Sequence, residues 1–333
     1  MTKKTIITVL LALLTMSATS QGTGAMVDSN PGWLWEISGN GLTQKSYLFG
    51  TCHGGGHSFT YEDVFGFRGG DEALSNVKCI YFETDLTVSK RLAAKEMSIA
   101  EYLGCDNDSS ENDLMPEGVN YESLFDSAHQ YQEVHQFLTQ KMGNAEYWKK
   151  TPIYWFFQLG GYNLAKGYYG IQAVEGVLST EAAKRGIEIG QLEDVKQHAQ
   201  WSNQYRSRER QQPLNIPLKT QATMLYIGIH NEDDQIMEPL KIIAEAYLEN
   251  DTCCMHDVLE DHNVLGNQTK YYTPNTETLK VLAMNNAWIP VIEQNIGQRP
   301  CIIAVGARHL LGHDGLIATL RRKGYTIEPV KKK

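Results

Sequence analysis

The stretch CIIAVGARHLLGHDG, Cys301 to Gly315, decides the fold that we predict for this chain of 333 residues. It begins with an apolar run that is typical of a buried strand, and His309 follows three residues after a glycine that ends the run. Near the other end of the chain, SYLFGTCHGGGH, Ser46 to His57, repeats the arrangement with His53. Ligands of open α/β sheets bind beyond the carboxyl ends of the strands. The two stretches therefore predict a functional site at one edge of a sheet.

The glycine three residues before each histidine is Gly50 in the first stretch and Gly306 in the second. We expect each glycine to let the backbone turn sharply off its strand and to leave room for a ligand. Among 10 histidines and 29 glycines, chance alone gives about one Gly-x-x-His. The chain holds three, the third running from Gly54 to His57. The placement of the motif at the ends of apolar strands therefore carries more weight than the motif itself.

Two further strand-like runs end in an acid. Lys78–Glu83 closes with Glu83, and Ile187–Leu192 is followed by Glu193. If these strands share one sheet with the first two, two imidazoles and two carboxylates converge on one crevice. Such a set can bind Zn, Mn, Co or Fe, or can perform acid–base chemistry without a metal. The alternative role for either glutamate is to cap the helix that follows it, because acids favour helix N-termini.

Other candidates for chemistry are weaker. His57 is expected in a loop rather than as a ligand, and Glu175 is expected to begin a helix. Cys52 precedes a candidate histidine, but adjacent residues of an extended backbone point to opposite sides. His256 and His262 lie six positions apart on a predicted helix, and therefore on different faces.

Strands and helices alternate along much of the chain, which predicts an α/β fold with a parallel-type sheet. The segments between residues 105 and 175 and between 195 and 275 are mostly helical in pattern and are expected to form a large insertion. The remaining predicted strands are Trp33–Ile37, Ser46–Gly50, Cys301–Val305 and Tyr325–Val330. The predicted helices of the core are 87–103, Glu175–Arg185, Asn275–Asn295 and Gly315–Lys323.

The N-terminus has the pattern of a secretory signal peptide. Lys3 and Lys4 precede the apolar run Ile6–Met16, and small residues follow it. The run is shorter than the about 20 apolar residues of a membrane-spanning helix, which is the alternative reading. We therefore predict that residues 1–20 are removed and that the protein is exported, to a periplasm or to the exterior.

The net charge indicates which partners to exclude, and the cysteines raise the question of disulfides. The formal net charge is −9, and removal of residues 1–20 leaves 28 Lys and Arg against 39 Asp and Glu, which disfavours nucleic acid as a partner. Export permits disulfides among the six cysteines, but their pairing cannot be read from the sequence. Cys79 and Cys301 lie inside apolar strand-like runs and are expected to be buried thiols.

Five segments together resemble the TraB/GumN family, which is related to the Tiki metalloproteases. They are WLWEISGNG, SYLFGTCH, CIYFETD, GIEIGQLEDVKQ and IIAVGARHLLGHDGLIATLRRKGYTIEPV, and they span Trp33 to Val330. The resemblance implies one domain over about residues 27–330, built of two pseudo-symmetric α/β halves. It places the paired histidines of the family on His53 and His309, its acid on Glu83, and its Leu-Glu motif on Glu193.

The resemblance also implies a function. We expect an exported, metal-dependent hydrolase of the peptidase type that acts on a polypeptide or a small molecule. Its divalent ion (Mn, Co or Zn) would be held by His53, His309, Glu83 and Glu193, the first three of which would also take part in catalysis. One departure from the family is that Met284-Asn285-Asn286 stands where an Arg-Asn pair is usual. The alternative is a haem-, metal- or peptide-binding protein of the same fold without turnover.

Overall fold

The computed structural model describes the chain from residue 32 to residue 330. Its gaps are 54–55, 67–68, 105–112, 199, 202–203, 205–215, 231–233, 250–251 and 253–274. The predicted signal peptide, three of the cysteines (Cys105, Cys253, Cys254), and His256 and His262 lie outside the described residues. No helix in the described part of the chain is long and apolar enough to cross a membrane.

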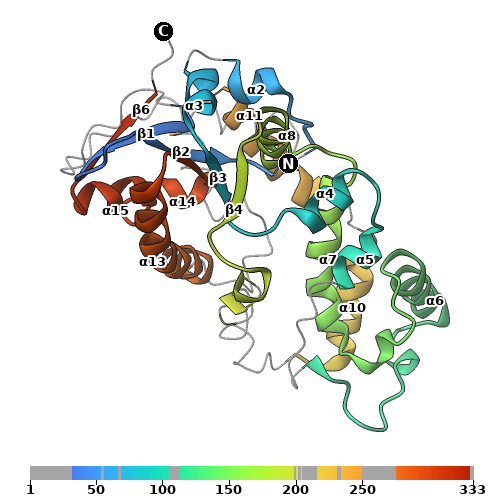
Figure 1. Ribbon diagram of the computed structural model, residues 1–333. Coiled ribbons are helices and arrows are strands. Elements are labelled where there is room, and N and C mark those ends of the chain that lie inside the picture. Colours follow the sequence, from blue (N-terminus) through green and yellow to red (C-terminus); the bar gives the residue numbers. More distant parts are fainter. Residues whose placement is uncertain are drawn as a thin grey trace, which may run out of the picture.

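Six strands form one sheet in the order β4-β3-β5-β2-β1-β6 (Figure 1). Strands β2, β3, β4 and β5 are mutually parallel, whereas β1 runs antiparallel to both of its neighbours. The bounds are β1 Leu34–Gly39, β2 Ser46–Thr51, β3 Cys79–Phe82, β4 Glu188–Gln191, β5 Cys301–Gly306 and β6 Tyr325–Pro329. The prediction of an α/β fold with parallel strands is confirmed.

The central strands are continuous apolar runs because both of their faces are covered. All residues of β2 and β3 are buried, and all of β5 except its last. Parallel sheets covered on both sides have this composition, in contrast to the alternation of a half-exposed strand. Thr51 pairs with Gly306, and Phe82 pairs with Ala304, so the carboxyl ends of β2 and β5 are level and β3 ends two residues earlier at the same edge. The predicted convergence of the strand ends is therefore present.

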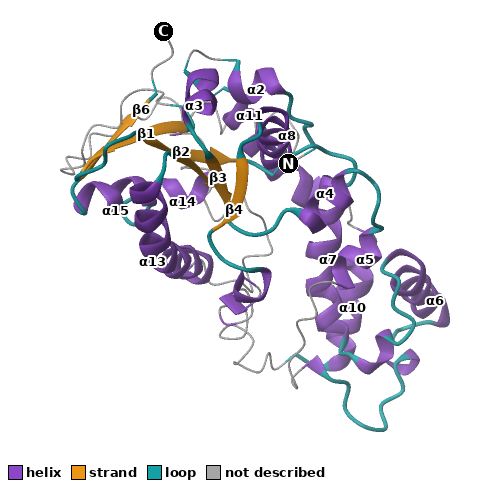
Figure 2. Ribbon diagram, in the orientation of Figure 1, coloured by secondary structure: helices purple, strands orange, loops and turns teal. Residues whose placement is uncertain are grey.

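Helices cover both faces of the sheet (Figure 2). One core layer is formed by the sheet with α2, α3, α8 and α11, and the other by the sheet with α13, α14 and α15. The bounds on the first face are α2 Tyr61–Phe65, α3 Gly70–Asn76, α8 Val174–Arg185 and α11 Asp234–Leu248. On the second face they are α13 Asn275–Gln298, α14 Ala307–Leu310 and α15 Leu316–Arg322.

A third core lies away from the sheet, within the predicted helical insertion. Its largest elements are α6 Ala128–Gln136, α7 Pro152–Tyr168 and α10 Leu218–His230, and aromatic side chains such as Tyr147 and Trp155 fill the space between them. A cluster of this size allows the lobe to hold its shape by its own packing.

The helix predicted over residues 87–103 is two helices, α4 Thr87–Ala93 and α5 Ile99–Gly104. Between them Lys95 adopts a positive φ of 60°, which ends the first helix. Ser98 and Glu101 then form a reciprocal pair of side-chain to backbone hydrogen bonds, which begins the second helix. The apolar periodicity continues across this break, and for that reason the sequence pattern alone suggested one helix.

Candidate functional site

His53 lies two residues beyond the end of β2 and is held by a carboxylate from α8. Its Nδ1 atom is 2.9 Å from Oε1 of Glu175. The same Oε1 atom accepts a hydrogen bond from the Thr51 hydroxyl at 2.5 Å. Glu175 is buried, and its other oxygen, Oε2, has no hydrogen-bond partner within the described structure. The pair therefore fixes the imidazole and leaves one buried carboxylate oxygen available to a ligand or to water.

The electrostatics of this pair favour the charged forms of both groups. The negative charge of Glu175 raises the pKa of His53 to about 9 against the opposing effect of burial, and Glu83 adds a smaller contribution. For Glu175, burial raises the pKa, but the charge and hydrogen bond of His53 outweigh it, so the net pKa lies below its ordinary value. Since 57% of the His53 side chain is exposed, solvent screens part of this attraction.

His309 lies on the short helix that follows β5 and is held by an amide from α13. Its Nδ1 atom is 2.8 Å from Oδ1 of Asn285. The Asn285 amide nitrogen donates to the carbonyls of His309 and Asp314, at 3.2 Å each. Because Oδ1 can only accept, the proton of the neutral imidazole lies on Nδ1, and its lone pair lies on Nε2. The ring of Trp288 packs against the imidazole at 4.6 Å between centroids.

Glu83, one residue beyond β3, interacts with both histidines. Its Oε1 atom accepts a hydrogen bond from the backbone N–H of Gly306 at 2.6 Å, and it is 3.8 Å from Nε2 of His309. It also contributes to the raised pKa of His53. The structure thus brings three of the four predicted side chains to one edge of the sheet.

Glu193 follows the edge strand β4, and its carboxylate has other partners. Oε1 accepts from His198 at 2.8 Å, and Oε2 accepts from Trp201 at 2.9 Å. Only its backbone connects it to the site, through the hydrogen bond from its N–H to the carbonyl of Glu83 at 3.0 Å. Within the described residues, the side chain is therefore placed to fix the chain after β4 rather than to join the other three.

Neither acid caps the following helix, which was the alternative for both. Asp85 accepts the backbone N–H of Thr87 at the start of α4, and Asp194 accepts that of Gln197. Asp85, two residues after Glu83, and Asp194, directly after Glu193, accept these N–H groups, so Glu83 and Glu193 remain available for the contacts described above.

The two glycines of the Gly-x-x-His motifs act by their lack of a side chain. Gly306 ends β5 and is the N-cap of α14, so the chain turns off the strand there as predicted, with φ −48°. Gly50 instead continues the strand to Thr51, so the predicted turn at that position is wrong. A Cβ atom on Gly306 would lie 3.3 Å from the Glu83 carboxylate. A Cβ atom on Gly50 would lie 3.0 Å from Leu310, on the helix that carries the second histidine. The close approach of strand, acid and helix therefore favours glycine at both positions, and the predicted room for a ligand stays a prediction.

Of the remaining sequence candidates, Glu175 joins the cluster through His53, and His57 and the buried cysteines have other partners or surroundings. His57 pairs with Asp63 at 3.4 Å, in the loop before α2. Cys52 is buried against the core, as are Cys79 and Cys301, so the prediction of buried thiols for the last two is confirmed. Glu175 begins α8 as expected, but the sequence did not reveal its contact with the first histidine.

A metal centre is not preassembled in the described part of the chain. No group of three or more His, Cys, Asp or Glu side chains has the geometry to hold an ion there. The donor chemistry nevertheless fits one. Histidines that bind metals usually donate the second ring N–H to an oxygen atom, and Glu175 and Asn285 supply that oxygen for His53 and His309. Each Nε2 atom is then the ring nitrogen that would coordinate.

The geometry defines a class of α/β proteins with an acid and two oxygen-anchored histidines beyond the carboxyl ends of parallel strands. A model of the TraB/PrgY/gumN family matches residues 33–329, which is nearly all of the described chain. The protein belongs to the TraB/PrgY/gumN family. No curated protein and no solved structure matches it.

Proposed function

We propose that this chain is an exported, metal-dependent hydrolase of the peptidase type. The observation that carries the proposal is the anchoring of both imidazoles through Nδ1, by Glu175 and by Asn285, with Glu83 beside them. This arrangement fixes the tautomer of each ring and directs its second nitrogen to the strand ends. Membership of the family supports the fold, and the cluster itself suggests the chemistry.

His53, His309 and Glu83 are the residues that would hold a divalent ion such as Mn, Co or Zn. When bound, such an ion polarises a substrate carbonyl and lowers the pKa of bound water toward 7. A His53 imidazole with a raised pKa must lose its proton before it can coordinate. The site should therefore take up metal with release of a proton, and more tightly at higher pH.

The side chains of this chain can move the protons of amide hydrolysis. Glu83 would accept a proton from the attacking water as the oxygen bonds to the carbonyl carbon, and would return it to the nitrogen as the C–N bond breaks. His309, fixed by Asn285, would hold the substrate and water in line with that carboxylate. Glu175 would keep His53 in its orientation throughout.

The alternative is that the site binds a metal, haem or peptide without turnover. One observation favours it, namely that the described residues hold no preassembled set of three ligands. The position where the family usually has arginine is Met284, which is buried in the core beside Trp288 and supplies no charge to the site. Asn285, the next residue, keeps its place against His309.

The test is a digest of a peptide library by the purified protein, with metal content measured and with Mn, Co or Zn restored after chelation. His309→Ala should lose metal and activity together, because a deleted ligand weakens the hold on the ion. Glu83→Gln should lower the rate by about 10²–10⁴-fold if the carboxylate serves as the base. Glu193→Gln should have the smaller effect.

His57→Ala provides a matched control, because it removes a histidine of the same motif type that contacts Asp63 instead of the cluster. Cleavage that persists after chelation and in both the His309 and Glu83 variants would place the chemistry elsewhere. Uptake of haem or metal by a wild type that cleaves nothing with any of the three ions would support the binding protein.

A further inference from the structure

The edge strand β4 has backbone groups that the sheet does not use. It ends the strand order, and among the residues that the structure describes β3 is its only partner in the sheet. The N–H groups of Glu188 and Leu192 donate to β3, at Lys78 and Phe82. Because the N–H and C=O of one residue in a parallel strand point to the same side, those of Ile189 and Gln191 point away from the sheet.

The four residues of β4 include neither lysine nor proline, although the shortness of the strand is itself one protection against a further strand. Natural sheet edges carry lysine, proline or bulges that prevent pairing. In β4 the only charged residue is Glu188, which forms an ion pair with Arg299 at 2.5 Å. Gly190 lets the ring of Tyr81 lie against the strand, where a Cβ atom would come within 2.5 Å of the ring. Ile189 remains 48% exposed, which is unusual for a large apolar side chain on an open edge.

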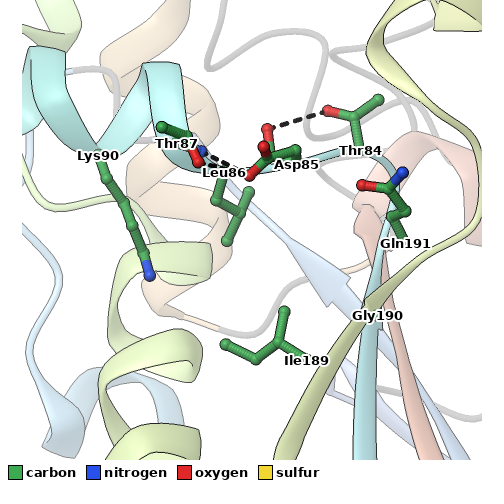
Figure 3. A pocket seen from close by; sticks show the side chains of 8 residues that line it. All are labelled: Thr84, Asp85, Leu86, Thr87, Lys90, Ile189, Gly190 and Gln191. Carbon is green, nitrogen blue, oxygen red and sulfur yellow. Dashed lines mark hydrogen bonds between the residues drawn. The ribbon is translucent and has the colours of Figure 1, made fainter.

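A pocket adjoins this edge and begins one residue after Glu83. It encloses about 260 Å³ and is lined by Thr84, Asp85, Thr87, Lys90, Ile189 and Gln191. Figure 3 shows Lys90 and Thr87, from α4, on one side of the pocket and Ile189 and Gln191, from β4, on the other. The volume is below the roughly 300–1,000 Å³ of a pocket for a whole small ligand. It suits one side chain of a larger substrate.

The charges in the pocket indicate which type of substrate side chain it would bind. The Oδ1 atom of Asp85 already accepts two hydrogen bonds from Thr87, at 2.9 and 2.8 Å. Lys90 is exposed and takes part in no ion pair recorded among the described residues. The Asp85 carboxylate keeps its charge but has donors at Oδ1, whereas the Lys90 ammonium is the charged donor left for a ligand in the described part of the pocket, which favours a side chain that carries oxygen acceptors.

We propose that an extended polypeptide pairs with the outward edge of β4 and places an acidic or amide side chain in this pocket. Main-chain hydrogen bonds to Ile189 and Gln191 would supply affinity, and the pocket would supply specificity, as in other cases of strand addition to a sheet edge. Because β4 separates this strand from β3, the bound polypeptide would have to leave the edge and cross the carboxyl end of β4 to reach Glu83. The inference rests on the proposed function only in naming this polypeptide as its substrate.

The first test is amide hydrogen exchange, resolved to single residues, in the full-length Glu83→Gln variant, which should bind peptides without consuming them. A degenerate library of short blocked peptides is the probe. In the protein without peptide, the amides of Ile189 and Gln191 should exchange freely, and they should become protected when peptide is added. If these amides are already protected without peptide and the protein has the mass of a dimer, the edge pairs with a second copy of the chain, which overturns the proposal.

The second test compares Gln191→Pro with Gln191→Ala. Proline removes the outward N–H and is tolerated on an edge strand, whereas alanine removes only the side chain. Both variants lose the Gln191 side chain that lines the pocket, but only proline loses the N–H, so proline should weaken peptide binding about fivefold or more relative to alanine, the usual worth of a hydrogen bond. Lys90→Glu should shift the preferred side chain from acidic to basic, whereas Lys45→Glu, far along the sheet, should not.

The two proposals fail in distinguishable ways. The protein could cleave peptides while β4 stays unprotected and the proline and alanine variants have equal kcat/KM. That result would overturn strand pairing and leave the proposed hydrolase intact. Protection of β4 by peptides that the wild type never cleaves would support strand pairing and remove the hydrolase. Absence of protection at saturating peptide overturns the inference in either case.

Discussion

Replacement of Asn285 by alanine should destabilise the protein and loosen the second histidine at once. The residue is 2% exposed and makes three hydrogen bonds, one to the imidazole of His309 and two to backbone carbonyls. At about 1 kcal/mol for each bond, the loss is about 3 kcal/mol in the free energy of unfolding. Alanine recovers up to about 0.7 kcal/mol through its higher helix propensity, so we expect a net loss of about 2–3 kcal/mol.

Asn286 offers a control on the same helix. It is the same residue type one position along α13, but it is exposed. Asn286→Ala should therefore change the free energy of unfolding only by the small gain in helix propensity. Denaturant unfolding of wild type and both variants, followed by circular dichroism, measures the difference.

The same variant tests the positioning of His309. Without its oxygen partner the imidazole can rotate or change tautomer, and losses of this kind cost about 10–100-fold in metal affinity. Metal titration of the folded Asn285→Ala protein below its unfolding midpoint measures this effect. If Asn285→Ala and Asn286→Ala unfold alike and bind metal alike, the reasoning from buried hydrogen bonds at this site is refuted.

Three other expectations concern the site and the N-terminus. Glu175→Gln should lower the pKa of His53 from about 9 toward its ordinary 6.5, because the attraction that favours the charged ring is removed. Nuclear magnetic resonance titration of the ring protons measures this pKa, and an equal pKa in wild type and variant would mean that the pairing is absent in solution. Gly306→Ala should reduce metal affinity with little change in stability, because its Cβ atom would displace the Glu83 carboxylate by a few tenths of an ångström; equal metal binding to wild type would contradict this. N-terminal sequencing of the mature protein should begin between about residues 19 and 27, and an intact initiator methionine in the cytoplasmic fraction would refute export.

The strands and their shared edge were predictable because burial on both faces of a parallel sheet leaves a direct trace in the sequence. Runs such as Cys301–Val305 are apolar at every position, and few other elements of that length are. The fact that the strand ends meet then follows from parallel pairing alone. For the same reason, Glu83 and both histidines could be assigned to one edge without knowledge of the strand order.

The groups that hold the histidines were not predictable, because their positions depend on how helices dock onto the sheet. Glu175 occupies the first turn of a helix, where an acid is ordinary, and its contact with His53 depends on the placement of α8. For Asn285 a signal did exist. It is a polar residue between Met284 and Trp288, on the apolar face of a helix, and buried polar groups require a partner.

The position of β5 has a consequence for the order in which the protein folds. This strand begins 219 positions after β3 ends (301 − 82), yet it inserts between β3 and β2. Until it arrives, the N-terminal strands lack their central neighbour, and Glu83 lacks the backbone N–H of Gly306. Contacts between such distant segments are slow to form, because the loop must close before any pairing stabilises it. The site should therefore form late in folding, when β5 pairs with both of its neighbours.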